Sequence, residues 1–95
     1  SSVITLDLKT GWNLLSLPLE PKEASVKIIF APIIDSIIKI EAFDQGAKTY
    51  DPSRPFNDLQ ELHAGDGFWI KVSRDASLEI TGTYPDRNIP EFIEG

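Results

Sequence analysis

The segment that most constrains the fold of this 95-residue chain is GDGFWIKV, at residues 65–72. Its two glycines bracket an aspartate, a combination that favours a turn, and the aromatic and β-branched residues that follow favour a strand. Because side chains alternate along a strand, one face of this segment is wholly apolar and is predicted to join the core. That face carries Phe68, Ile70 and Val72, and the opposite face carries Trp69 and Lys71. The second face either covers the edge of the core or meets a ligand.

Alternating and β-branched segments elsewhere predict further strands, arranged as three hairpins of sequence neighbours. The six predicted strands cover residues 3–8, 12–17, 36–43, 47–50, 68–72 and 76–82. Proline cannot donate a hydrogen bond to a neighbouring strand, so Pro18 and Pro21 are expected to end the second strand. The residues expected to face inward are Ile4, Leu6, Leu8, Ile38, Ile40, Ala42, Leu78 and Ile80.

Two short segments have helical spacing instead. The first begins near Glu23 and is predicted to end near Ala31, because Pro32 disfavours helical backbone in the residue before it. The second is a single turn, for which Asn57 is a candidate cap. The apolar residues that define the two segments are Val26, Ile29, Phe30 and Ile33 in the first, and Phe56, Leu59 and Leu62 in the second.

Together these segments predict a mainly β fold: an antiparallel β-sandwich or small barrel of about six strands with one or two short helices. Residues 1–83 are predicted to form a single module, since a chain of this length buries a core without disulfides or metal ions. Residues 84–95 are polar, contain proline and lack a periodic pattern, which indicates a linker or an extended C-terminal arm.

The composition argues against several classes of partner. A net charge of −6 disfavours nucleic acids and anionic membrane surfaces, which bind proteins through clustered lysine and arginine. No apolar run reaches the ~20 residues that span a bilayer, so membrane insertion is not expected. The chain has no cysteine for disulfides or thiolate metal sites, and its carboxylates lack the alternating spacing of calcium loops. Neither a metal nor a cofactor is therefore predicted.

Catalysis is not predicted either. Nucleophilic catalysis needs a base beside the nucleophile, and His63 is the single histidine of the chain. It follows the second predicted helical turn, where it is expected to face the last carbonyl groups of that turn. Aspartates in or near the predicted turns are expected to hydrogen-bond to their own backbone rather than to act as acids or bases. These aspartates are Asp44, Asp51, Asp58 and Asp66.

Aromatic side chains are the better indication of function, because their flat faces can pack against sugar rings. Trp12, Phe56 and Phe68 are expected to fill the core of so small a β domain. Trp69, Tyr50 and Lys71 form the set expected to meet a ligand at the surface, and Tyr84, at the start of the tail, is a further candidate.

Several motifs resemble one accessory module of secreted and cell-surface proteins of bacteria and archaea. Residues 11–19, GWNLLSLPL, resemble its GWNLxSxP opening, and residues 57–72 resemble its NxLxxLxxGxGYWIKV segment. Smaller matches are Ser25-Val26 in the helix, the YDP element at residues 50–52 and the LxIxG strand at residues 78–82. The chain departs from the pattern at Phe68, where tyrosine is usual, and at Ala64, where proline is usual.

The resemblance covers residues 3–83. It implies a non-catalytic role in an extracellular or cell-surface protein, beside hydrolase, adhesion or S-layer-like domains. It implies no single agreed ligand. Two functions stay open at this point. The chain is either a carbohydrate-binding module of a larger protein, with polysaccharide as its partner, or a spacer and protein-interaction domain that packs on its neighbours.

Overall fold

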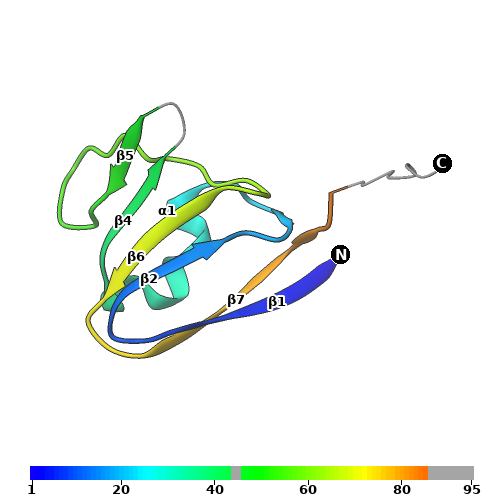
Figure 1. The fold of residues 1–95 in the computed structure, drawn as a ribbon, viewed down its shortest axis with the longest axis horizontal. Helices are drawn as coiled ribbons and strands as arrows, with labels where there is room; N and C mark the ends of the chain where they lie inside the picture. The colour runs from blue at the N-terminus through cyan, green and yellow to red at the C-terminus, as the bar shows by residue number, and fades with distance from the viewer. Residues whose placement is uncertain (44–45, 86–95) are drawn as a thin grey trace.

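The computed structural model describes residues 1–43 and 46–85 (Figure 1). Its strands form two antiparallel sheets, with strand orders β1-β7-β3 and β2-β6-β4-β5. These strands are β1 (Ser2–Leu8), β2 (Gly11–Ser16), β3 (Glu20–Pro21), β4 (Ile37–Phe43), β5 (Ala47–Tyr50), β6 (Gly67–Val72) and β7 (Ala76–Thr83). The predicted mainly β, sandwich-like architecture is confirmed, and within the described residues neither sheet closes into a barrel. Most of the arm predicted at residues 84–95 lies outside the described residues, which end at Pro85.

One long antiparallel ribbon runs through both sheets. In the first sheet β1 pairs with β7, from Ser2 opposite Gly82 to Leu8 opposite Ala76. Beyond a corner at residues 9–10 and 73–75, the same two chain segments continue as β2 and β6 in the second sheet (Figure 1). Asp75 Oδ1 fixes the corner, because it accepts hydrogen bonds from the Thr10 amide (2.8 Å) and the Thr10 hydroxyl (3.0 Å).

Two of the three predicted hairpins are therefore wrong. β1 does not pair with β2, and β6 does not pair with β7, because each short turn carries the chain from one sheet to the other. The third hairpin is confirmed, since β4 pairs with β5 from Ile40 opposite Tyr50 to Phe43 opposite Ala47. A polar turn of two or three residues suits a hairpin and a sheet corner equally well, so turn chemistry does not distinguish them.

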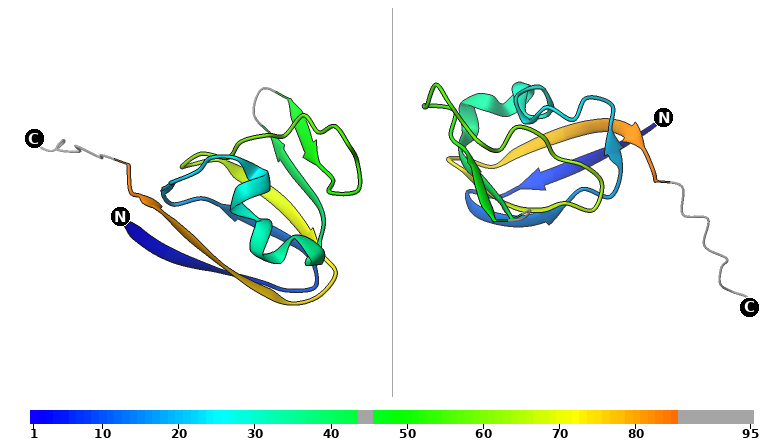
Figure 2. Two further views of the ribbon diagram at one scale, coloured as in Figure 1. Left: turned by 180° about the vertical axis from the view of Figure 1, so that it is seen from behind. Right: turned by 90° about the horizontal axis from the view of Figure 1, so that it is seen from above.

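The core lies between the sheets and is covered by α1 (Val26–Ile29) and the 3-10 helix η1 (Ala31–Ser36). Figure 2 shows both helices on the side of the sheets that is turned away in Figure 1. Phe30 and Phe68 are fully buried there and meet edge to face, with ring centroids 6.1 Å apart. The predicted end of the first helix is confirmed, because α1 gives way at Phe30 to the tighter η1.

β4 carries an irregularity that changes which side chains face inward. Its register against β6 shifts between Ile37 and Lys39, as in a β-bulge. Ile37 is consequently buried and Ile38 is exposed, so the inward position predicted for Ile38 is wrong. Beyond the shift, Ile40 and Ala42 are buried as predicted.

The helical turn predicted around Asn57 does not form, because this loop runs extended alongside β5 and the start of α1. The Leu59 amide donates to the Thr49 carbonyl (3.1 Å), and the Gln60 carbonyl accepts from the Val26 amide (3.0 Å). Leu59 and Leu62 are still buried, whereas Phe56, predicted to be core, is 88% exposed. Asn57 instead joins the two ends of the loop, since its side chain bonds to the backbone of Asp51 (2.7 and 3.2 Å).

Candidate functional site

The outer face of the four-stranded sheet carries three exposed aromatic side chains on three adjacent strands. Trp12 on β2 is 46% exposed, Trp69 on β6 is 37% exposed and Phe43 on β4 is 62% exposed. They do not lie in one row across the sheet. Trp12 is opposite Lys71, one outward position along β6 from Trp69, and Trp69 is opposite Glu41, one outward position along β4 from Phe43. We refer to Trp12, Trp69 and Phe43 as the aromatic diagonal.

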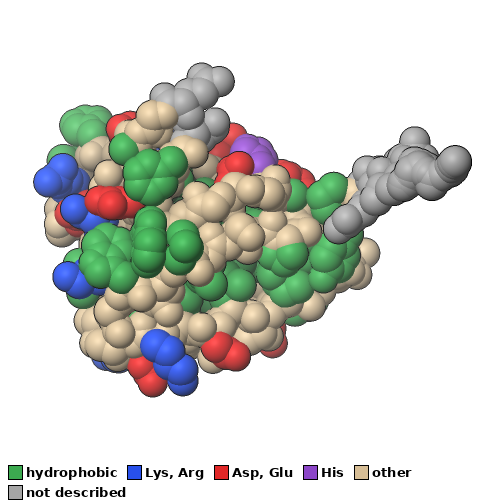
Figure 3. Space-filling view, viewed as in Figure 1, with side chains coloured by type: hydrophobic (Ala, Val, Ile, Leu, Met, Phe, Trp, Pro, Cys, Tyr) green, Lys and Arg blue, Asp and Glu red, His purple; other side chains and the backbone are tan. Residues whose placement is uncertain are grey.

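The aromatic diagonal lines a shallow open hollow of about 470 Å³ together with Glu41. Figure 3 shows hydrophobic side chains gathered beside charged ones on this face. The indole planes of Trp12 and Trp69 are perpendicular (89°), with ring centroids 6.3 Å apart. The surface is therefore stepped rather than flat.

Charged groups flank one side of the aromatic diagonal. Lys71 Nζ lies 5.7 Å from the centroid of the Trp12 ring, within the range of a cation–π contact. Lys39 Nζ lies 3.5 Å from Glu41 Oε2. On the other side of Trp69, its partner on β2 is the exposed, apolar Leu14. The hollow thus has one charged flank and one apolar flank.

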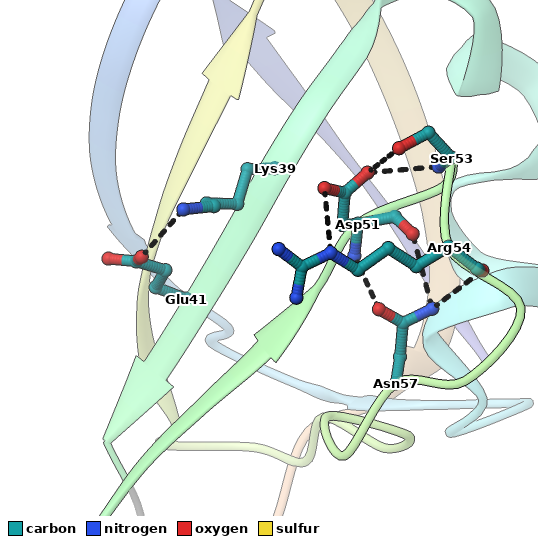
Figure 4. A network of polar contacts seen from close by, with 6 residues as sticks. All are labelled: Lys39, Glu41, Asp51, Ser53, Arg54 and Asn57. Atoms are coloured by element: carbon teal, nitrogen blue, oxygen red, sulfur yellow. Dashed lines mark hydrogen bonds and ion pairs between the residues drawn. The ribbon is translucent and has the colours of Figure 1, made fainter.

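A loop after β5 adds polar groups near Lys39 (Figure 4). Asp51 accepts hydrogen bonds from the Ser53 hydroxyl (2.7 Å) and amide (2.9 Å), and its Oδ2 lies 3.6 Å from Arg54 Nε. These hydrogen bonds lower the pKa of Asp51, and the charges of Arg54 and Lys39 lower it further. Asp51 is consequently an anion at neutral pH, held in place by its own loop.

The structure brings together only part of the predicted ligand-binding set. Trp69 and Lys71 lie on the outer face of the sheet, as expected. Tyr50 does not join them: it is opposite Ile40 on the inner face and only 7% exposed, so its role as a surface residue is a wrong prediction. Tyr84 is exposed but follows β7 in the other sheet, so it does not extend the aromatic diagonal.

Three members of the site, Trp12, Phe43 and Glu41, were not predicted as ligand contacts. Trp12 was expected in the core, and the structure places it outside because the register of β2 against β6 turns Trp12 and Leu14 to the outer face. Glu41 had no sequence signal of its own. Pairing residues 12–17 with residues 68–72 would have found Trp12, because it puts Trp12 beside Lys71 on the same face as Trp69. Phe43 and Glu41 require the further pairing of β4 with β6.

A second polar cluster surrounds His63, which lies between two glutamates instead of facing a helix end. Its Nδ1 is 2.7 Å from Glu20 Oε2, and its Nε2 is 3.0 Å from Glu61 Oε1. The Ala64 amide donates to the other oxygen of Glu20 (3.0 Å). The hydrogen bonds with Glu20 and Glu61 raise the pKa of His63, and those from Ala64 and His63 lower the pKa of Glu20. The cluster ties the loop before β6 to β3.

We expect this cluster to make stability depend on pH. Because the folded-state pKa of His63 is raised, its stabilising contribution is complete below the ordinary value of 6.5 and is lost as the pH rises through the folded value. The His63 side chain is 48% exposed, so the loss between about pH 5.5 and pH 9 should stay below about 1 kcal/mol. Urea unfolding of wild type and of His63→Gln across this pH range tests the prediction, since the free energy of unfolding of the variant should not fall as the pH rises. Equal slopes of the free energy of unfolding against pH in the two proteins would show that the ion pairs of His63 contribute nothing to stability.

The aspartates of the predicted turns that the structure describes accept hydrogen bonds from backbone amides. Asp66 accepts from the His63 amide (2.8 Å), so its predicted local role is confirmed together with that of Asp51. Asp58 instead accepts from the Thr49 amide on β5 (2.7 Å), nine residues away, so its predicted bond to its own turn is wrong. Asp44 lies outside the described residues. Among residues 1–43 and 46–85, no group of three or more potential ligands is placed to hold a metal ion. None of the described helices has the length and apolar character to cross a membrane.

No family model, curated protein sequence or solved structure matches the chain. The resemblance of residues 11–19 and 57–72 to an accessory module of secreted proteins therefore stays a prediction. The function of the aromatic diagonal has to be inferred from its shape and its charges.

Proposed function

We propose that this chain is a non-catalytic recognition module of a secreted or cell-surface protein, and that it binds a single glycan chain along the aromatic diagonal. The observation that carries the proposal is the exposure of two tryptophans, Trp12 and Trp69, side by side on one sheet face. Large apolar side chains normally join the core, and an exposed group of them marks a binding surface.

The chemistry of the aromatic diagonal suits a sugar chain. A pyranose ring has apolar C–H faces, which pack on aromatic rings, and a rim of hydroxyl groups that need hydrogen-bond partners. Glu41 and Lys39 supply an acceptor and a donor beside the rings. Because the two indole planes are perpendicular, the surface suits one soluble, twisting chain better than the flat face of a crystalline polysaccharide.

A second function, docking against a neighbouring domain, is favoured by one feature of the same face. Leu14 is exposed beside Trp69, and its side chain has no group that could hydrogen-bond to a sugar. A protein partner would cover Leu14 and both tryptophans together. The two functions use the same residues, so only the identity of the bound partner separates them.

We expect Trp69→Ala and Trp12→Ala each to weaken glycan binding about tenfold, because each removes one aromatic stacking contact. The measurement is retention of the domain on a soluble glycan array and on insoluble polysaccharides, followed by titration of the retained glycans. Phe56→Ala is the matched control, since it removes an exposed aromatic ring from outside the aromatic diagonal. Circular dichroism should show all three variants folded.

Two results would contradict glycan binding. One is the absence of retention on every glycan, which would leave docking on a neighbouring domain as the better account. The other is retention that Trp69→Ala and Trp12→Ala leave unchanged, which would place the glycan elsewhere on the surface.

A further inference from the structure

We propose that the bound glycan carries an anionic substituent, a carboxylate or a sulfate, and that this group binds the ammonium group of Lys71 beside Trp12. The inference deepens the proposed function and rests on it. It names the class of sugar, which the aromatic rings alone do not specify, since any pyranose face can stack on an indole.

The placement of Lys71 is the first observation. Lys71 is opposite Trp12 on β2 and opposite Lys39 on β4. Two like charges directly opposite each other on neighbouring strands destabilise a sheet. The fold does not require this pair, because a polar or aromatic residue could fill either outward position. The charge of Lys71 therefore does not stabilise the sheet and is available to a ligand.

The partners of the two lysines are the second observation. Lys39 is neutralised by Glu41, at 3.5 Å. The ion pairs found among the described residues do not include Lys71, whose ammonium group lies over the Trp12 ring instead. A cation held over an indole keeps donors directed away from the ring, toward whatever binds next to it. Lys71 thus places an available positive charge at the end of the aromatic diagonal.

The local balance of charge is the third observation. The whole chain carries −6, yet this corner of the sheet gathers Lys71, Lys39 and Arg54 around Glu41 and Asp51. Figure 4 shows Arg54 reaching from its loop toward the strand that carries Lys39. An acidic protein repels polyanions at long range but can still bind an isolated negative group at such a spot, because salt screens charges beyond about 8–10 Å.

The ligand chemistry follows from these positions. The Lys71 ammonium group lies over the Trp12 ring, so a sugar bound at this end of the aromatic diagonal would bring its ring substituents next to that ammonium group. A carboxylate or sulfate on the sugar ring would form a charge-assisted hydrogen bond, which is about twice as strong as one to a neutral hydroxyl. Uronic acids and sulfated sugars both supply this chemistry.

The experiment presents the full 95-residue chain with neutral, uronate-bearing and sulfated glycans on one array, and then titrates matched pairs. The methyl ester of oligogalacturonate replaces each charged carboxylate with a neutral ester on the same sugar chain. Dextran, which is neutral, and dextran sulfate differ in the sulfate. We expect the charged member of at least one pair to bind about tenfold more tightly, and rising salt to weaken it. The pair that responds identifies the anionic group.

Variants of Lys71 connect the effect to this side chain. Lys71→Met should remove most of the preference for the charged glycan, and Lys71→Arg, which keeps the charge, should retain it. Lys27→Met is the matched control, because Lys27 is an exposed lysine on α1, outside the four-stranded sheet. It should leave both members of each pair unchanged.

Failure of this inference can be told apart from failure of glycan binding itself. If neutral and charged members bind equally, and Trp69→Ala weakens both, the glycan site stands and the role of Lys71 is wrong. If the preference survives in Lys71→Met, the anionic group binds elsewhere and the inference is again wrong. If no glycan of any kind is retained, the proposed function and the inference both fail.

Discussion

Replacing Phe68 with alanine should lower the free energy of unfolding by about 4 kcal/mol. Phe68 is fully buried on β6, and its ring meets that of Phe30 edge to face at 76°. The substitution removes a ring from the space between sheet and helix and leaves a cavity that the surrounding strands cannot fill. Urea unfolding followed by tryptophan fluorescence measures the change.

Phe56→Ala provides the control for this prediction. It deletes the same side chain from a position that is 88% exposed, so the free energy of unfolding should change by less than about 0.5 kcal/mol. A double-mutant cycle with Phe30→Ala should show about 1 kcal/mol of coupling between the two buried rings. Similar losses in Phe68→Ala and Phe56→Ala would mean that Phe68 does not belong to the core.

Gly82→Ala should destabilise the fold by about 3 kcal/mol, through crowding rather than through a cavity. Gly82 lies on β7 where the two-residue strand β3 pairs with it, and its partner there is Pro21. An added Cβ would lie 2.1 Å from the Glu20 carbonyl oxygen and 2.8 Å from a methyl group of Leu19. The carbonyl belongs to the backbone, so β3 would have to move off β7, and Glu20 would move away from His63 with it.

Gly67→Ala is the matched control, since Gly67 also lies in a strand and its φ is not positive. There the nearest atom to an added Cβ is the Leu15 carbonyl oxygen, at an ordinary 3.9 Å. The variant should be as stable as wild type within about 0.5 kcal/mol, because alanine restricts the unfolded chain without straining the folded one. If urea unfolding gave the two variants the same midpoint, the close approach of β3 to β7 would have no energetic consequence.

The sequence predicted where the strands lie far better than which strands pair. Alternation correctly identified Leu6, Leu8, Leu78 and Ile80 as inward residues, because the period of side chains along a strand is a local property. Pairing is not local. The contact of Ser2 with Gly82 joins opposite ends of the described chain, and nothing in the turns at residues 9–10 or 73–75 encodes it.

The wrong predictions for single residues have the same cause, since contacts with distant segments decided where these side chains lie. Phe56 was expected in the core because apolar residues three apart suggest a helical turn, but hydrogen bonds to β5 and α1 extend this loop and leave the ring outside. Ile38 was expected to face inward, and a bulge, which shifts the alternation by one residue, turned it outward.

The candidate site was predictable in part. Trp69 and Lys71 share a face because they are two residues apart in one strand, so sequence alone could identify them. Trp12, Phe43 and Glu41 come from two other strands, and their contribution depends on the order β2-β6-β4. Tyr50 was assigned to the same face, but it is opposite Ile40 and packs into the core. A surface assembled from several strands becomes visible only when the pairing is known.

The pairing of β1 with β7 also determines how the fold would respond to mechanical tension. The first residue of β1 is opposite Gly82, so the outer ends of the two strands lie together at the same end of the molecule (Figure 1). Force applied through these ends would open the ladder like a zipper, one residue pair after another, instead of shearing all its hydrogen bonds at once. A domain loaded in this way yields under little force. Such a geometry is therefore poorly suited to carrying sustained tension between these two strand ends.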